Sequence, residues 1–256
     1  LRRLDDGMDQ WIQLRAQPIH DLHKPDAPPH YEILMAVQDD SGHFVSPATL
    51  IEVAERYHRM TDVDKWVFRR VMDWMEQNPE VIQAIHGLSI NLSGNTISEP
   101  AALDEILNDL TRRRVDRSRV CFEITETAAV RDLGAAVSFI RDVRQLGCKV
   151  SLDDFGTGMS SYAYLQELPV DYVKIDGIFI RNLKDNVKDQ ALVRSIAEMA
   201  QLLGMKTIAE YVEDEHTEEF LRLLGVGYGQ GYHYGRPAIL NELAGQIMAR
   251  QELEGN

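Results

Sequence analysis

Residues 14–37 decide the fold of this chain and read LRAQPIHDLHKPDAPPHYEILMAV. The stretch holds two β-rich runs, Leu14–Ile19 and Tyr31–Val37, and the ten residues His20–Pro29 form all but the last residue of the connection between them. Two parallel strands need a crossover of about a dozen residues or more, usually a helix. The three prolines of this connection also disfavour a helix. We therefore predict that the first two strands pair antiparallel.

Beyond this pair, β-rich runs alternate with segments of helical periodicity, a pattern typical of a closed α/β barrel or a doubly wound sheet. Further strands are predicted at Leu88–Leu92, Val120–Thr125, Lys149–Asp154, Tyr172–Asp176, Thr207–Val212 and Tyr228–Tyr234. Helices are predicted at Ala48–Met60, Val63–Glu76, Ala101–Arg113, Ala135–Leu146, Gln190–Leu203 and Glu218–Leu224. Thr61 is expected to cap the second helix, with Asp64 three residues on, and Gly147 and Gly204 follow helix ends. We expect an α/β fold, a modified (βα)8 TIM-like barrel with the first strand antiparallel.

Composition limits the class of protein. The 256 residues fit one large barrel domain, and no apolar run approaches the roughly 18 residues that span a bilayer. Because the chain begins at Leu1, we interpret residues 1–256 as a single domain from a longer multidomain protein, without membrane contact of its own. Cys121 and Cys148 lack metal-ligand or redox spacing and are expected to be reduced core thiols of a cytoplasmic domain.

The formal net charge of −14 bears on the ligand. It argues against binding of a nucleic-acid polymer, which needs a basic face. An acidic protein still binds a phosphate-bearing ligand when metal ions supply the positive charge. Such a site requires carboxylates gathered in one place.

Polar side chains stand at interior positions near the ends of the predicted strands. They are Glu32, Asn91, Glu123, Asp153, Asp154, Lys174, Glu210 and Gln230. Each has an ordinary alternative, such as a solvent-facing charge or a turn contact, but barrel sites are assembled from several strand ends, where these residues would meet. One lysine cannot neutralise five clustered carboxylates, whereas two divalent cations could, and oxygen ligands suit Mg or Mn.

The motifs around these residues resemble the EAL domain family of cyclic di-GMP phosphodiesterases over essentially the whole chain. The matching segments are Gln17–Ile19, Glu32–Leu34, Asn91–Ser93, Glu123–Glu126, Asp153–Gly158, Lys174–Asp176, Ala209–Glu213 and Gly229–Tyr232. The resemblance implies metal-dependent hydrolysis of cyclic di-GMP to linear pGpG, commonly by a homodimer.

The same resemblance implies a role for each matched residue. Metal ligands would be Glu32, Asn91, Glu123, Asp153, Asp154 and Glu210. Catalysis would involve Lys174, Glu210, Gln230 and Asp153, with Lys174 and Glu210 positioning or activating the attacking water. Substrate would contact Gln17, Leu34 and Gln230. Glu126 and Thr157 would anchor the loop Asp153–Ser161. Met159, Tyr162 and Tyr164, which follow the Asp-Asp pair, suit either a dimer contact or barrel packing.

Two positions depart from the family pattern. Ala36 stands where the family usually has an arginine that binds a phosphate, and the lost charge-assisted bond is typically worth about 1.5–3 kcal/mol. Tyr211 replaces a glycine, and three placements are open: it crowds the site, stacks on a base, or faces outward. The insertion Lys24–Pro29 is expected to reshape the edge of the substrate site.

These departures leave a choice between classes of function. The chain is either an active phosphodiesterase with weakened substrate binding or a module that binds cyclic di-GMP without cutting it. The intact ligand set and lysine favour the enzyme. A barrel lyase or another metal-dependent phosphohydrolase is a more distant alternative, for which no motif speaks.

Overall fold

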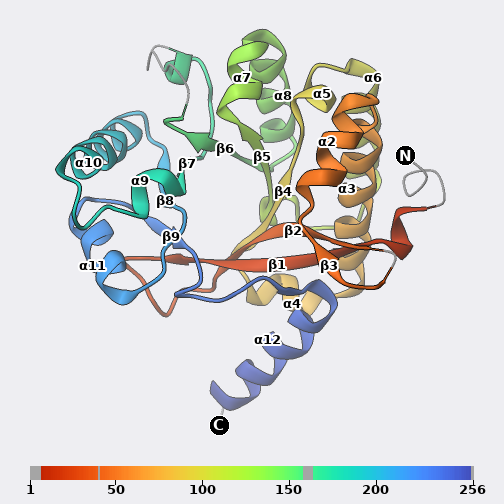
Figure 1. Cartoon of the computed structure of the whole chain (residues 1–256). Helices are drawn as coiled ribbons and strands as arrows, with labels where there is room; N and C mark the ends of the chain where they lie inside the picture. Colours follow the sequence, from red (N-terminus) through yellow and green to blue (C-terminus); the bar gives the residue numbers. More distant parts are fainter. Residues whose placement is uncertain (1–6, 40, 158–163, 255–256) are drawn as a thin grey trace.

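The computed structural model describes residues 7–39, 41–157 and 164–254, and its strands close into a barrel ringed by helices (Figure 1). Around the barrel the strands follow the order β1-β9-β8-β7-β6-β5-β4-β2, and β2 pairs with β1 again. The expected α/β barrel is confirmed. The barrel strands are β1 (Ile12–Asp21), β2 (His30–Gln38), β4 (Gly87–Asn91), β5 (Val120–Thr125), β6 (Lys149–Phe155), β7 (Tyr172–Ile175), β8 (Lys206–Ala209) and β9 (Tyr228–Gln230).

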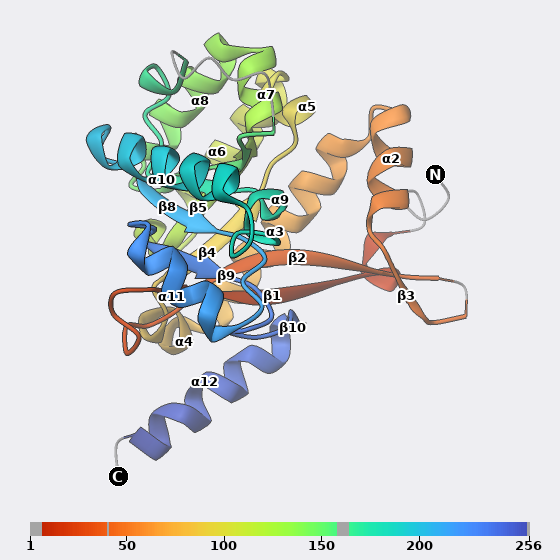
Figure 2. The ribbon, with the colours of Figure 1, turned by 60° about the vertical axis from the view of Figure 1, so that its left-hand side comes forward.

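The first strand is the reversed one, as predicted. β1 pairs antiparallel with both of its barrel neighbours, with Gln17 opposite Glu32 on β2 and Ile19 opposite Gln230 on β9. The other barrel strands pair parallel. Paired β1 and β2 are long and reach beyond the shorter strands, where β3 (Phe44–Val45) and β10 (Ala238–Ile239) add to their edges (Figure 2).

The reversal also places the insertion Lys24–Pro29. It joins the end of β1 to the start of β2, and β2 starts level with β4, at His30 opposite Gly87. The insertion therefore lies at the N-terminal end of the parallel strands. The expectation that it reshapes the substrate edge is wrong, because the polar strand ends lie at the opposite end of the barrel.

Helices cover the outside of the barrel, and α12 projects away from it (Figure 1). They are α2 (Ala48–Arg56), α3 (Met60–Gln77), α4 (Pro79–Ala84), α5 (Gly94–Ile97), α6 (Pro100–Arg112), α7 (Glu126–Arg131), α8 (Leu133–Gln145), α9 (Gly177–Ile180), α10 (Val187–Leu202), α11 (Glu215–Leu223) and α12 (Leu240–Glu254), with 3-10 turns at Met8–Gln10, Arg117–Arg119 and Tyr164–Gln166. Within the described ranges, no helix combines the length and the apolarity that crossing a membrane requires.

The boundaries differ from the sequence expectation at α2 and α3. The helix predicted to reach Met60 stops at Arg56, and His58 adopts a φ of 55° before α3 begins at Met60. Thr61 therefore lies inside α3 and caps nothing; its hydroxyl donates to Glu99 at 2.9 Å. Asp64 instead accepts hydrogen bonds from the backbone N–H of Ser93, at 2.9 Å, and from its hydroxyl, at 2.6 Å.

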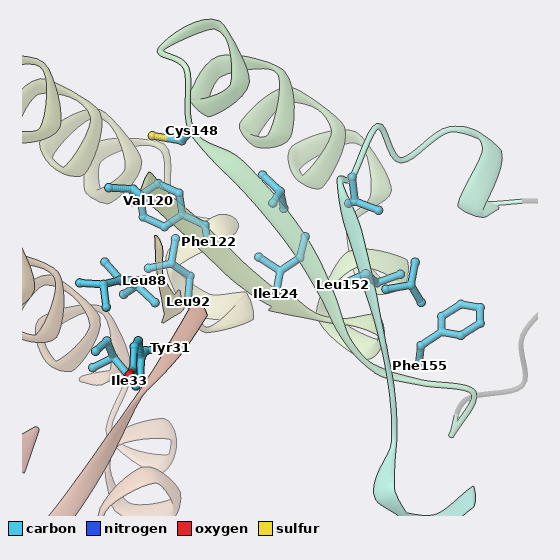
Figure 3. Close-up of a cluster of buried hydrophobic side chains, with 14 of the residues drawn as sticks. Tyr31, Ile33, Leu88, Leu92, Val120, Phe122, Ile124, Cys148, Leu152 and Phe155 are labelled. Carbon is cyan, nitrogen blue, oxygen red and sulfur yellow. The ribbon is translucent and has the colours of Figure 1, made fainter. Parts of the chain in front are cut away.

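The two faces of each strand meet different surroundings. On β5, Phe122 and Ile124 belong to the large apolar core between strands and helices, part of which is shown in Figure 3. The alternate residue Cys121 faces the barrel interior, in a small cluster with Ile19, Tyr172 and Ile208. Since successive side chains alternate, Glu123 points to the interior too, one step nearer the strand's C-terminal end. The small cluster and the buried His30–Ser89 hydrogen bond thus occupy the interior nearer the N-terminal ends of the parallel strands, and Lys174 with the carboxylates occupies it at their C-terminal ends.

Both cysteines are buried and free. Burial raises the pKa of the Cys121 thiol well above its usual value and that of Cys148 to about 12. Two buried thiols without a disulfide agree with the expectation of reduced cysteines in the core.

Candidate functional site

Lys174 of β7 lies at the centre of the charged end of the barrel and is fully buried. Its Nζ atom contacts carboxylates from four other strands or strand ends. The distances are 3.0 Å to Glu32 Oε2, 3.0 Å to Glu123 Oε2, 3.2 Å to Asp153 Oδ1 and 2.9 Å to Glu210 Oε1. Four residues that lie far apart in the sequence thus converge on one ammonium group, as the strand pattern predicted.

The pKa of Lys174 reports this surplus of negative charge. Burial alone would lower it, but the four carboxylates outweigh burial and hold it well above its ordinary value. Burial likewise favours a neutral Glu32, yet the charge of Lys174 and hydrogen bonds from Gln230 and Asn91 lower the pKa of Glu32. These two residues form the charged pair at the centre of the site.

The remaining carboxylates lack enough positive charge. Burial raises the pKa of Glu123 to about 8 and that of Glu210 to about 7, although Lys174 opposes both shifts. Burial and the neighbouring Asp153 raise the pKa of Asp154 to about 6. One ammonium cannot satisfy this many carboxylates.

Two groups of acidic residues have the geometry for metal binding. In Glu32, Glu123 and Asp153, and again in Asp153, Asp154 and Glu210, one ligand atom from each residue lies within 4.8 Å of the others. Asp153 belongs to both groups, so the two groups are adjacent and share one residue. Asp154 reaches the second group because its φ of 55° and a register shift in β6 turn the strand end.

Several polar atoms of the site need a partner. Glu123 Oε1 and Gln230 Oε1 are buried and accept no hydrogen bond from the described residues, and Asp153 Oδ1 faces Lys174 without accepting one. A buried polar atom without a partner is costly, and oxygen atoms are the ligands that hard divalent cations prefer. The residues present therefore fit the divalent cations that the sequence suggested.

Amide side chains hold Glu32 from two sides. Asn91 Nδ2 donates to Glu32 Oε1 at 2.8 Å, and Gln230 Nε2 donates to Glu32 Oε2 at 2.7 Å and to Gln17 Oε1 at 3.2 Å. Gln17 in turn donates to the backbone of Gly235 at 3.2 Å. Asp64 holds Ser93, two residues after Asn91, by two hydrogen bonds, a support that sequence reasoning missed because it assigned Asp64 to a helix cap.

A cavity of about 400 Å³ opens beside this cluster. The expected substrate contacts Gln17, Leu34 and Gln230 all line it. The full lining is Gln17, Glu32, Leu34, Asp176, Gly177, Arg181, Glu210, Tyr211, Glu213, Gln230, Gly231 and Tyr232. Among the described residues, Arg181 is the sole basic one in this lining; it lies at the end of α9, and no motif in the sequence marked it.

Ala36 takes no part in the cavity. It is buried on β2, four residues beyond Glu32, and pairs with Gln13 of β1. A larger cavity, of about 450 Å³, lies elsewhere, between β1, α3 and the start of α12, away from the clustered carboxylates.

The loop after β6 is held at its start. Glu126 Oε2 accepts from the backbone N–H of Gly156 at 2.9 Å, and Glu126 Oε1 accepts from the hydroxyl of Tyr164. Thr157 donates to the carbonyl of Asp154 at 3.0 Å. These contacts place both residues at the loop, as expected. Tyr164 packs against the large apolar core, whereas Met159 and Tyr162 lie outside the described residues.

Comparison with known proteins identifies the family. The model of the EAL domain matches residues 2–237, so the chain belongs to the EAL domain family. Cyclic di-GMP phosphodiesterase PdeB of Shewanella oneidensis is 40% identical over 239 residues, which cover 93% of this chain and 28% of that protein. Cyclic di-GMP phosphodiesterase PdeF of Escherichia coli is 33% identical, with coverage of 91% and 31%. The chain thus spans less than a third of these curated relatives.

Solved structures agree with this assignment. The PaMucR phosphodiesterase in complex with c-di-GMP superposes with a TM-score of 0.86 at 30% identity, covering 94% of this chain and 98% of that chain. An EAL domain protein of Listeria monocytogenes gives a TM-score of 0.83 at 27% identity, covering 96% of each chain.

Proposed function

We propose that this chain hydrolyses cyclic di-GMP to linear pGpG with the help of two divalent cations. The observation that carries the proposal is the convergence of Glu32, Glu123, Asp153 and Glu210 on the buried Lys174 beside an open cavity. Family membership, and relatives named as cyclic di-GMP phosphodiesterases, support the substrate.

The ligands would divide between two positions. Glu32, Asn91, Glu123 and Asp153 would hold one cation, and Asp153, Asp154 and Glu210 the other, which agrees with the two acidic groups. When bound, the cations would lower the pKa of a coordinated water and would stabilise charge that develops on the phosphate oxygens. Mg and Mn both suit such oxygen ligands.

The chain's own residues position the reacting groups. Lys174 supplies a fixed positive charge at the bottom of the site, and Glu210, which lines the cavity, accepts a hydrogen bond from the attacking water. Gln230 holds Glu32 through its Nε2 atom, and the Oε1 atom of Gln230 remains available to a further hydrogen-bond donor. Addition of one water breaks one P–O ester bond of the ring, which yields a terminal phosphate and a free hydroxyl.

A second candidate is a domain that binds cyclic di-GMP without cutting it. The observation that favours it is Ala36, because no arginine reaches the cavity from this position and Arg181 is the sole basic residue that the described part of the chain contributes to the lining. Weak substrate binding is compatible with either function, so the two differ in chemistry rather than in ligand.

We also propose a homodimer and a cytoplasmic location, and that the chain acts as one domain of a longer protein.

One experiment separates the candidates. The protein is incubated with cyclic di-GMP and Mg²⁺ or Mn²⁺, and pGpG is followed by chromatography, with Glu123→Gln as the matched inactive control. We expect pGpG only with metal and only from the unchanged chain. Binding by calorimetry without product would make the domain a receptor, and neither binding nor product would refute both functions.

A further inference from the structure

Tyr211 occupies a backbone conformation that suits glycine. Its φ is 59°, in the left-handed region that few side chains adopt. The neighbouring backbone is fixed, because the N–H of Glu210 donates to Ile175 at 3.1 Å and that of Val212 to Gln230 at 2.9 Å. A tyrosine is therefore held in a strained position directly after Glu210, and such strain is most often found at functional sites.

The helix beside Tyr211 is shaped to receive the ring. A Cβ atom at Gly177 would lie 2.8 Å from Tyr211 Cβ, so a larger residue at 177 would collide with Tyr211. The guanidinium of Arg181 lies over the ring, 4.1 Å from its centroid. Gly177 and Arg181 are one helical turn apart, so α9 supplies both the space for the ring and a cation stacked on it.

The ring is not directed away from the site. Tyr211 lines the cavity and remains 40% exposed, so part of its surface is open to a ligand. Tyr232 lines the same cavity, is 53% exposed, and carries Arg236 over its ring at 4.3 Å. A cavity with two aromatic rings, each stabilised by an arginine, suits a ligand with flat aromatic groups.

The charged residues that line the cavity indicate which chemical group of the ligand contacts Tyr211. Glu32, Asp176, Glu210 and Glu213 also line it, so anionic groups of a ligand are favoured only near Arg181 and near the cations that the carboxylate cluster would bind. A planar, uncharged purine meets no such repulsion at Tyr211. Stacking on an aromatic side chain is the ordinary way in which proteins bind an unpaired base.

We propose that Tyr211 is a specificity-determining residue whose ring stacks on a guanine base of the ligand, supported by Arg181 and Gly177. The inference rests on the proposed function, since it assumes cyclic di-GMP as ligand. It assigns to Tyr211 the second of the three placements considered from the sequence.

The test compares Tyr211→Gly with Tyr211→Phe, and uses Tyr57→Ala as a control, because Tyr57 is 51% exposed and does not line the cavity. KM and kcat are measured with cyclic di-GMP and with methyl p-nitrophenyl phosphate, a diester without a purine. Stacking of one base corresponds to about 5- to 100-fold in affinity. We expect Tyr211→Gly to raise KM for cyclic di-GMP within that range with kcat changed less than about threefold.

The remaining variants show whether the ring is responsible. Tyr211→Phe keeps an aromatic ring and should restore KM, and Tyr57→Ala should behave as the unchanged chain. On methyl p-nitrophenyl phosphate the loss in kcat/KM with Tyr211→Gly should be less than about threefold. Glycine accepts a φ of 59° without strain, so Tyr211→Gly should melt no lower than the unchanged chain, which excludes misfolding as the cause.

Other results would overturn the inference. An unchanged KM with Tyr211→Gly would mean that the ring makes no contact with the base, and a lower KM would mean that it crowds the site. If the unchanged chain cuts neither diester, the proposed hydrolysis has failed, and the Kd for cyclic di-GMP by calorimetry replaces KM. A Kd that Tyr211→Gly raises would then retain the stacking role in a receptor, and an unchanged Kd or absent binding would refute it.

Discussion

The bottom and the edge of the site are built differently. The bottom consists of Glu32, Glu123, Asp153 and Lys174, which are at most 9% exposed and contact one another. The edge consists of Leu34, Arg181, Tyr211 and Tyr232, which surround the cavity and are partly or largely exposed. Buried charges depend on one another, so a change at the bottom leaves another charge without a partner. Residues of the edge can be substituted one at a time. The bottom therefore determines the chemistry of the site, and the edge determines which ligand it binds.

The largest effect is expected from Lys174→Met. Loss of the ammonium leaves four carboxylates without their common cation and removes a fixed positive charge from the reaction site. We expect kcat for cyclic di-GMP to fall by about 10²- to 10³-fold, since removal of one preorganised donor from a reaction site typically costs that much.

Lys149→Met is the matched control for this variant. Lys149 is also a partly buried lysine on a barrel strand, but it lies at the start of β6, where its Nζ atom contacts His86 and Tyr172. It should keep kcat within about threefold. If the two variants lost activity equally, the bottom of the site would have no special role.

A smaller effect is expected on thermal stability. Mg²⁺ should stabilise a variant of the bottom less than a variant of the edge. Mg²⁺ that binds only the folded chain raises the free energy of unfolding by about 2.7 kcal/mol at a concentration 100 times its Kd. We expect the melting temperature of the unchanged chain to rise with Mg²⁺, that of Asp153→Asn to rise much less, and that of Arg181→Met to rise as in the unchanged chain. Calorimetric scans with chelator and with Mg²⁺ measure these shifts; an Mg²⁺ response retained in Asp153→Asn would contradict the shared-ligand site.

A tenfold effect is expected from Ala36→Arg. An arginine on the same face of β2 as Glu32 and Leu34 would offer a charge-assisted bond to a phosphate, so the Kd for cyclic di-GMP should fall about tenfold. Ala36→Met adds similar bulk without charge and should not tighten binding. An affinity unchanged by Ala36→Arg would indicate that another group, with Arg181 the nearest candidate, already binds the phosphate.

The smallest effect is expected from Arg181→Met. Methionine keeps much of the bulk over the Tyr211 ring but removes the cation, whose stacking is worth about 0.5–1 kcal/mol at an exposed site. KM should therefore rise by about two- to fivefold, with kcat nearly constant. A loss in kcat as large as that of Lys174→Met would place Arg181 with the bottom of the site instead.

The sequence was informative wherever function required a costly residue. Carboxylates and a lysine inside strands contradict ordinary strand composition, so Glu123, Asp153 and Lys174 could be recognised before their contacts were known. The short connection before β2 predicted the reversed strand for a similarly physical reason, because so short a connection with prolines cannot form a crossover.

What the sequence did not predict depends on contacts between distant segments. β8 ends at Ala209 rather than Val212, because Tyr211 adopts a left-handed conformation that its own type disfavours. Asp64 has the spacing of a helix cap, but the network with Ser93 and Thr96 takes its carboxylate. Arg181 belongs to no motif and becomes relevant only once α9 lies against Tyr211.

The reversed strand also has a consequence for the order of folding. Gln230 donates to Gln17 across 213 residues and to Glu32 across 198 residues, so the last barrel strand meets the first two only when the chain is nearly complete. Pairings of such long range are slow to form, because the entropy of closing the intervening loop must be overcome first. Glu32 obtains its full set of partners only after this closure. Tight metal binding should therefore appear late in refolding, together with the joining of the barrel's ends, and can serve as a kinetic signal for that step.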